Sequence, residues 1–136
     1  MADAKIDPIR LSERRPLSPH LQIYRPVLTM MMSITHRITG MALYGGTLLL
    51  AWFLIALAAG ASPFATAAAV YGSIIGRIVL FLFTWALFQH LLGGLRHFMW
   101  DMGYGMDHPE REYLAWGTLI GGISLTIIVW IIALVA

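Results

Sequence analysis

Residues 33–60 read SITHRITGMALYGGTLLLAWFLIALAAG, and this stretch decides the fold. From Ile38 onward it contains no charged residue, and most of its side chains are aliphatic or aromatic. An α-helix needs about 20 consecutive apolar residues to span the hydrocarbon core of a bilayer. The stretch therefore predicts a transmembrane helix whose entry carries a compact polar cluster of serine, threonine, histidine and arginine.

Two further apolar stretches extend this interpretation to the whole chain. IVLFLFTWALFQHLLGGL, residues 78–95, is uncharged and just long enough to span, and YLAWGTLIGGISLTIIVWIIALVA, residues 113–136, is uncharged throughout. We expect helices at about 28–59, 70–100 and 113–135. A small-residue connection, GASPFATAAA, and a polar loop, DMGYGMDHPERE, join them. The predicted fold is an all-α membrane protein of three transmembrane helices, residues 28–136, that forms part of a heteromeric helix bundle.

The composition supports a membrane protein and excludes several other classes. Hydrophobic residues make up 59% of the chain and charged residues 12%, more apolar than a soluble fold can bury. The absence of cysteine excludes disulfides, iron–sulfur ligation by this chain and a cysteine-type zinc site. The net charge of +2 is not gathered on a soluble face, so we expect no nucleic-acid partner.

The N-terminal residues 1–27 are expected to form a polar cytoplasmic arm with one short amphipathic turn around LQIY. No apolar signal-peptide region precedes Leu28, so we expect an unprocessed chain and a bacterial inner-membrane location. Of the nine lysines and arginines, only Arg77 falls beside the first connection. The other eight flank the arm or the polar loop: Lys5, Arg10, Arg14, Arg15, Arg25, Arg37, Arg96 and Arg111. The positive-inside rule then places the N-terminus and the polar loop in the cytoplasm.

His90 is the candidate for chemistry inside the bilayer, because an ionisable residue within a span is a functional hypothesis by default. Gly93 and Gly94 lie one helical turn away, where missing side chains leave room for a large flat group such as haem. The structural alternative is a histidine that hydrogen-bonds a neighbouring helix. A bis-histidine haem needs a second imidazole. His97 shares the face of His90 and His36 is nearer the surface, so that imidazole would come from another chain.

Two arginines and two histidines are expected at the cytoplasmic level of the bilayer, where they suit anionic haem propionates. His36 and Arg37 enter the first helix, and Arg96 and His97 leave the second. The alternative for Arg37 and Arg96 is that they reach up to lipid phosphates.

Ser33 and Arg37 pose a separate question, because their i, i+4 spacing places a hydroxyl and a cation on one helix face. This pair at the hydrocarbon boundary fits an amphiphilic carbonyl compound such as a quinone. The alternative for Ser33 is a hydrogen bond to its own helix backbone. In the third span Gly117, Gly121, Gly122 and Ser124 predict a small-residue packing face.

Three motifs together resemble one family. RPLSPHLQIY, SITHRITG and HLLGGLRHFMWDMG, in this order, are similar to segments of the cytochrome b subunit of succinate dehydrogenase, the larger of its two membrane anchors. The resemblance covers almost the whole chain.

The resemblance implies a set of roles. His90 would be an axial ligand of haem b, with the other axial histidine in the small membrane-anchor subunit. His36 and His97 would help hold the haem propionates, and Ser33 and Arg37 would line the ubiquinone pocket. The further partners would be a flavoprotein subunit with covalent FAD and an iron–sulfur subunit, and neither of those cofactors would be bound by this chain.

The function expected from the sequence is therefore a membrane-anchor and quinone-site subunit of succinate:ubiquinone oxidoreductase, which passes electrons from the iron–sulfur subunit to quinone. Two alternatives stay open. One is a fumarate reductase-type anchor that uses menaquinone, and the other is a small transporter component without redox chemistry.

Overall fold

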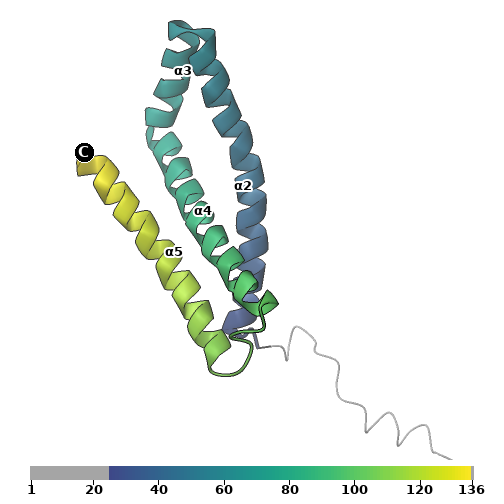
Figure 1. Cartoon of the computed structure of the whole chain (residues 1–136). Helices are drawn as coiled ribbons and strands as arrows, with labels where there is room; N and C mark the ends of the chain where they lie inside the picture. Colours follow the sequence, from purple (N-terminus) through teal and green to yellow (C-terminus); the bar gives the residue numbers. More distant parts are fainter. Residues whose placement is uncertain (1–24, 136) are drawn as a thin grey trace, which may run out of the picture.

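The chain folds into long helices joined by short connections (Figure 1). The structure is a computed structural model, and it describes residues 25–135. Its helices are α2 (Leu28–Ala59), α3 (Ala61–Gly72), α4 (Ile74–Asp101) and α5 (Glu110–Val135). The turn expected around LQIY and most of the basic arm lie outside the described residues.

Three of these helices, α2, α4 and α5, are long and apolar enough to cross a membrane. Their most apolar windows have mean hydropathies of 2.0, 1.8 and 2.5, and at most 17% of any window is buried inside the chain. Each helix therefore presents most of its apolar surface outward, to lipid or to other helices. The predicted fold class, an all-α membrane protein with three spans, is confirmed.

The connection between the first two spans differs from the sequence interpretation. GASPFATAAA was expected to be a short linker, but residues Ala61–Gly72 form the helix α3, and the second span begins at Ile74 instead of about residue 70. Pro63 lies in the first turn of α3, where its missing N–H breaks no helical hydrogen bond. The alanines that follow have the highest helix propensity. α5 also begins earlier than expected, at Glu110.

Ser73 separates α3 from α4. Its backbone is extended and its Oγ accepts a hydrogen bond from the Gly76 N–H at 3.0 Å, which is an N-cap for α4. Gly76 is enclosed here, because a Cβ at this position would meet the backbone of Val70 and Tyr71. The chain thus turns at Ser73 and enters the second span.

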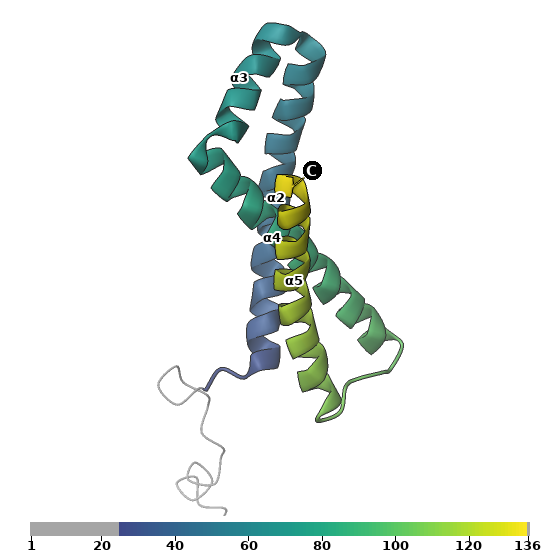
Figure 2. The same ribbon diagram turned by 90° about the vertical axis from the view of Figure 1, so that its left-hand side faces the viewer.

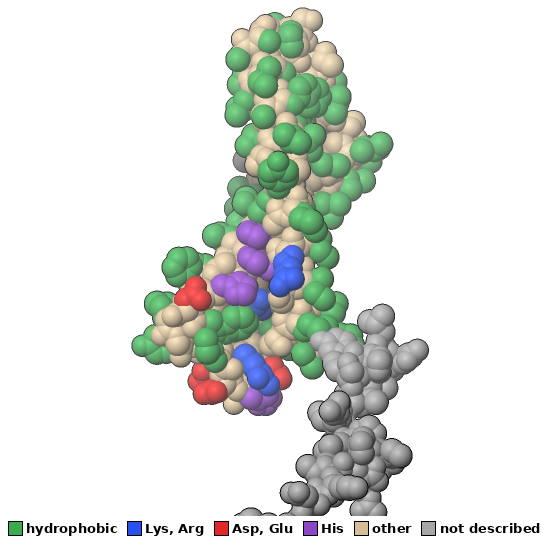
Figure 3. All heavy atoms as spheres, turned by 90° about the vertical axis from the view of Figure 1, so that its right-hand side faces the viewer, with side chains coloured by type: hydrophobic (Ala, Val, Ile, Leu, Met, Phe, Trp, Pro, Cys, Tyr) green, Lys and Arg blue, Asp and Glu red, His purple; other side chains and the backbone are tan. Residues whose placement is uncertain are grey.

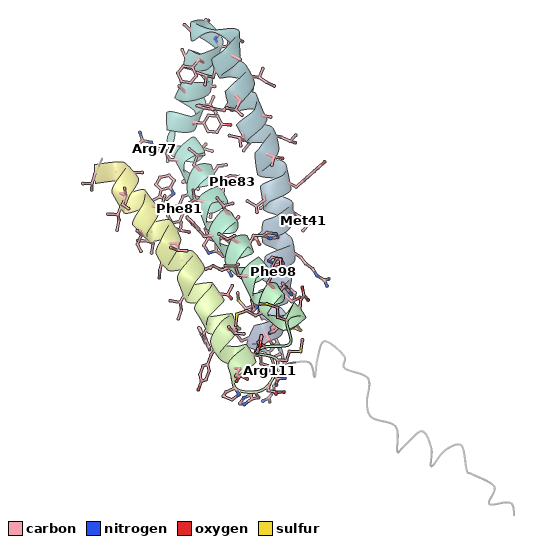
Figure 4. All side chains as sticks on the ribbon, in the orientation of Figure 1. Met41, Arg77, Phe81, Phe83, Phe98 and Arg111 are labelled. Atoms are coloured by element: carbon pink, nitrogen blue, oxygen red, sulfur yellow. The ribbon has the colours of Figure 1, made fainter. Side chains whose placement is uncertain are left out.

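α4 is the central helix, and it packs against both α2 and α5. Figure 2 shows α4 running obliquely across the other two spans. We call the end formed by the starts of α2 and α5 and the end of α4 the loop end. The opposite end, formed by the end of α2, α3 and the start of α4, is the hairpin end. Figure 4 shows Arg111 at the loop end and Arg77 near the start of α4.

Small residues allow α4 and α5 to approach closely. A Cβ at Gly121 would meet Leu92, and one at Gly122 would meet Gln89. The predicted small-residue face is only partly right, since Gly117 has open space around its Cα and Ser124 is exposed. The buried positions of α5 are instead Ala115, Thr118, Gly122 and Thr126, at intervals of three and four residues along one face.

Candidate functional site

Three histidines meet where α2 crosses α4, toward the loop end (Figure 3). The imidazole of His36 stacks on that of His90, with ring centroids 3.9 Å apart and an interplanar angle of 7°. His36 also contacts His97 at a centroid distance of 5.1 Å. The structure therefore brings together the proposed iron ligand and both proposed propionate partners.

A hydrogen bond donated by Nδ1 orients the imidazole ring of His90. Nδ1 lies 3.0 Å from the backbone carbonyl oxygen of His36 and 3.3 Å from Thr39 Oγ1. A carbonyl oxygen can only accept, so Nδ1 carries the proton and Nε2 carries the free lone pair. Within the described residues Nε2 makes no hydrogen bond, and it is not among the enclosed polar atoms. His90 therefore presents an unpaired, accessible nitrogen of the kind that binds a metal.

Two glycines make this crossing possible, one from each helix. A Cβ at Gly40 of α2 would lie 2.9 Å from His90 Cε1, and a Cβ at Gly93 of α4 would lie 2.5 Å from His36 Nδ1. Gly93 thus receives the ring of His36. Gly94 differs, because nothing lies within 4 Å of its Cβ position. Of the glycine pair expected to leave room for a flat group, only Gly94 faces open space.

The position of His36 differs from the expectation that it lies nearer the surface than His90. Their stacked rings are at one level, because the tilt of α4 across α2 brings residues 36 and 90 together. Two imidazoles stacked face to face at 3.9 Å cannot coordinate opposite sides of one iron, because axial ligands must point at each other across the metal. Within this arrangement His36 cannot serve as the second axial ligand of an iron bound by His90.

Arg96 is a fully buried cation without an acceptor among the described residues. Only 2% of its surface is exposed, and Nε, Nη1 and Nη2 are all enclosed and unpaired. Its guanidinium lies 5.0 Å from the centroid of the Trp100 ring, a cation–π contact that offsets only part of the desolvation. The alternative that Arg96 reaches lipid phosphates is wrong for this structure, because the side chain is enclosed by the helices.

Ser33 and Arg37 lie one turn apart near the start of α2. Ser33 is half-buried, and within the described residues its hydroxyl makes no hydrogen bond, whereas Thr35 and Thr39 of the same helix bond back to their own backbone. The backbone alternative for Ser33 is therefore not observed here. Arg37 is exposed and has no acceptor among residues 25–135. A hydroxyl and a cation on adjacent turns are both available to a ligand.

Sequence reasoning missed Thr39 and Gly40, which contact His90 directly. Both belong to SITHRITG, so the signal was present as a hydroxyl residue and a glycine at its end. It also missed Gln89, which is 2% exposed with Oε1 enclosed and unpaired against Gly122. Among the described residues no three histidine, aspartate or glutamate side chains are arranged to hold a bare metal ion. A metal at His90 would need further ligands from a cofactor and another chain.

The fold and this cluster define a multi-pass membrane protein with polar groups concentrated at the crossing of two spans. Residues 12–133 match the family model described as succinate dehydrogenase/fumarate reductase transmembrane subunit, and the chain belongs to this family.

Curated relatives extend the similarity over most of the chain. The succinate dehydrogenase cytochrome b556 subunit of Paracoccus denitrificans is 42% identical over 118 residues, covering 87% of this chain and 91% of the relative. The corresponding subunit of Rickettsia conorii is 35% identical, covering 87% and 92%. The succinate dehydrogenase cytochrome b560 subunit of Reclinomonas americana is 37% identical over 134 residues, covering 91% and 90%.

Proposed function

We propose that this chain is the large membrane-anchor subunit of a bacterial succinate:ubiquinone oxidoreductase, where it shares haem b with a small anchor subunit and forms part of the quinone site. The observation that carries the proposal is the orientation of His90, whose Nδ1–H is bonded to α2 and whose Nε2 is free inside a spanning helix. The names of the relatives, all succinate dehydrogenase cytochrome b subunits, support the same assignment.

The residues of the crossing fit a haem. His90 would supply one axial ligand through Nε2, and the other axial histidine would belong to the small anchor subunit, since His36 is stacked on the same side. His36 and His97 would help hold the propionates. The enclosed guanidinium of Arg96 and the unpaired Nδ1 of His36 need polar partners that residues 25–135 do not supply, and carboxylates are such partners. A bound haem supplies a one-electron carrier.

Ser33 and Arg37 would bind the head of the ubiquinone substrate. The Ser33 hydroxyl, which is not engaged by its own helix, would donate a hydrogen bond to a quinone carbonyl oxygen. Arg37 would stabilise the negative charge that this oxygen gains as electrons arrive, an electrostatic contribution that is strongest near the low-dielectric membrane interior. The oxidation of succinate would take place in a flavoprotein subunit with FAD, and electrons would reach the quinone through an iron–sulfur subunit.

The orientation in the membrane follows from the distribution of charge. The arm, the loop 102–109 and hence the loop end would face the cytoplasm, and the hairpin end would face the opposite side. The soluble subunits would then dock beside the quinone pair Ser33 and Arg37. Of the alternatives, the transporter is disfavoured by the family match. The menaquinone-type fumarate reductase anchor belongs to the same family, and the relatives' names favour succinate dehydrogenase over it.

The decisive experiment is a spectrum of the purified complex with and without His90. The parent complex should show a Soret band and a sharp reduced α band typical of haem b, and the extracted quinone should be ubiquinone. His90→Leu should abolish the bis-histidine spectrum in complexes that still contain this chain. An unchanged bis-histidine spectrum in assembled His90→Leu complex would exclude His90 as the ligand.

The orientation can be tested with single cysteines, because the chain has none of its own. Met106→Cys in the exposed polar loop should resist an impermeant thiol reagent in intact cells and react in inverted vesicles. Ser62→Cys, exposed in α3, is the matched control and should show the reverse pattern. Labelling of Met106→Cys in intact cells would overturn the proposed topology.

A further inference from the structure

Resting on the proposed function of His90, we infer that Thr39 and Gly40 are positioning residues for the haem ligand: Thr39 and the His36 carbonyl hold its Nδ1–H, and Gly40 admits its ring. These two α2 residues would set both the direction of Nε2 and the electron donation of the imidazole to iron.

The hydroxyl of Thr39 is built into the site. Only 1% of Thr39 is exposed, so its Oγ1 cannot exchange its contacts for water. The hydroxyl proton is directed to its own helix, with carbonyl oxygens of Thr35 and His36 at 2.9 and 3.0 Å. A lone pair of Oγ1 is thereby left facing His90 Nδ1 at 3.3 Å. Thr39 thus adds a second acceptor to the one supplied by the His36 carbonyl.

Thr39 differs in this respect from its neighbour on the same helix. Thr35, one turn earlier, also donates to a backbone carbonyl, that of Met31 at 2.9 Å, but among the described residues its side chain makes no hydrogen bond to a histidine. Both threonines therefore hydrogen-bond to the backbone of their own helix, and of the two Thr39 alone also lies near the His90 ring nitrogen.

Gly40 controls the space for the His90 ring. A Cβ at this position would lie 2.9 Å from Cε1, closer than real Cβ atoms approach, and 3.4 Å from Nδ1. The ring is bounded on another side by the stacked imidazole of His36, so it can move away from a Cβ only by leaving its hydrogen bonds. Gly45, on the same helix, has nothing within 4 Å of its Cβ position.

The consequence for a ligated haem is electronic. An acceptor on Nδ1–H increases the basicity of the imidazole and so favours the ferric state, which lowers the reduction potential. Removing the Thr39 acceptor should therefore raise the midpoint potential of the haem. A threonine that only packed α2 against α4 would affect stability and leave the potential of the remaining haem unchanged.

The test is a redox titration of the haem in the purified complex, with potentials compared at equal haem content. Thr39→Val, which keeps the shape and removes the hydroxyl, should raise the midpoint potential, and Thr39→Ser should restore the parent value. Thr35→Val is the matched control and should leave it unchanged. Should Thr39→Val fail to assemble, Thr39→Ala removes the same hydroxyl without added bulk. A parent-like potential in Thr39→Val or Thr39→Ala would overturn the role of Thr39.

Gly40 is tested by the geometry of the ligand. Gly40→Ala should reduce the haem content per covalent flavin and alter the g-values of the ferric haem, which depend on the planes of the axial imidazoles. Gly45→Ala should change neither. Full haem content with parent g-values in Gly40→Ala would show that the close approach does not orient the ligand.

His90→Leu separates this inference from the function on which it rests. If His90→Leu loses the bis-histidine spectrum while Thr39→Val and Gly40→Ala behave as the parent, the positioning role alone fails. If assembled His90→Leu retains the spectrum, the ligand assignment and the positioning role fail together.

Discussion

The loop end and the hairpin end of this protein share one packing feature but differ in the chemistry of the side chains that form it. At both ends a ring from one helix lies directly on a glycine of another. At the loop end the rings are imidazoles, His90 on Gly40 and His36 on Gly93, whereas toward the hairpin end Phe83 lies on Gly46. Close approach of helices thus occurs toward both ends of the described residues, and of these two places the loop end combines it with polar side chains.

The surroundings of the two ends differ accordingly. Toward the hairpin end a cavity of about 310 Å³ between α2, α3 and α4 is lined almost wholly by apolar atoms, with Phe53 and Phe83 among its walls. Its polar lining residue, Tyr71, donates its hydroxyl to the Leu49 carbonyl oxygen at 2.7 Å. Apolar walls can face lipid at no penalty, but enclosed unpaired nitrogens such as those of Arg96 cannot. The enclosed, unpaired polar atoms of the loop end therefore support the proposal that this region binds a ligand.

The largest expected effect is that of Arg96→Met on haem retention, which tests whether Arg96 is paired with an anion. If Arg96 pairs with a carboxylate in the assembled complex, Arg96→Met leaves that carboxylate buried alone and should weaken haem retention by about 3–5 kcal/mol. The temperature of haem release, followed by Soret absorbance, measures this loss. Arg77→Met, which changes an exposed arginine near the start of α4, should leave the release temperature unchanged.

Whether Arg96→Met weakens haem retention shows whether Arg96 has an anionic partner. Replacement of a buried charge that has no partner by an apolar residue of similar volume is neutral or stabilising. Haem retention equal to or better than that of the parent would therefore show that no anion pairs with Arg96.

The second effect concerns the quinone pair. Ser33→Ala should slow quinone reduction by a factor of about ten to a hundred, because one hydrogen bond to a partly charged group contributes about 1.5–3 kcal/mol. Succinate oxidation by a soluble artificial acceptor should be nearly unchanged, and Arg37→Leu should impair quinone reduction at least as much. Both activities are measured on one preparation and normalised to covalent flavin. Equal ratios of the two activities in variant and parent would exclude the quinone assignment.

The smallest effect concerns the apolar crossing. Gly46→Ala sets a Cβ in steric conflict with the edge of the Phe83 ring and should destabilise the packing of α2 on α4 by about 1–3 kcal/mol. Dissociation temperatures of the membrane subunits measure this, and Gly45→Ala, which faces open space, is the control. The haem spectrum of assembled Gly46→Ala complex should match the parent. A changed spectrum would show that the two ends are not independent.

The spans were predictable because long uncharged runs have few alternatives in a chain of this composition. α3 was missed because GASPFATAAA was interpreted as a short small-residue connection, although its alanines favour a helix and a proline in a first helical turn is well tolerated. His90 could be selected because it is the histidine within a long uncharged run of the sequence, although the structure places the ring of His36 at the same level. Its contacts with Thr39 and Gly40 could not be predicted, because they depend on the rotation and tilt of α4 relative to α2.

The reciprocal contacts at the loop end fix the register of two helices. Gly40 of α2 receives His90 of α4, and Gly93 of α4 receives His36 of α2. A slide of one helix by a single residue would set Thr39 or Met41 against the His90 ring. It would set Leu92 against the His36 ring in one direction only, because Gly94 flanks Gly93 on the other side. The two glycines and two histidines therefore favour this register of α2 on α4. The Gly40–His90 contact is the more restrictive of the two, because both neighbours of Gly40 carry side chains.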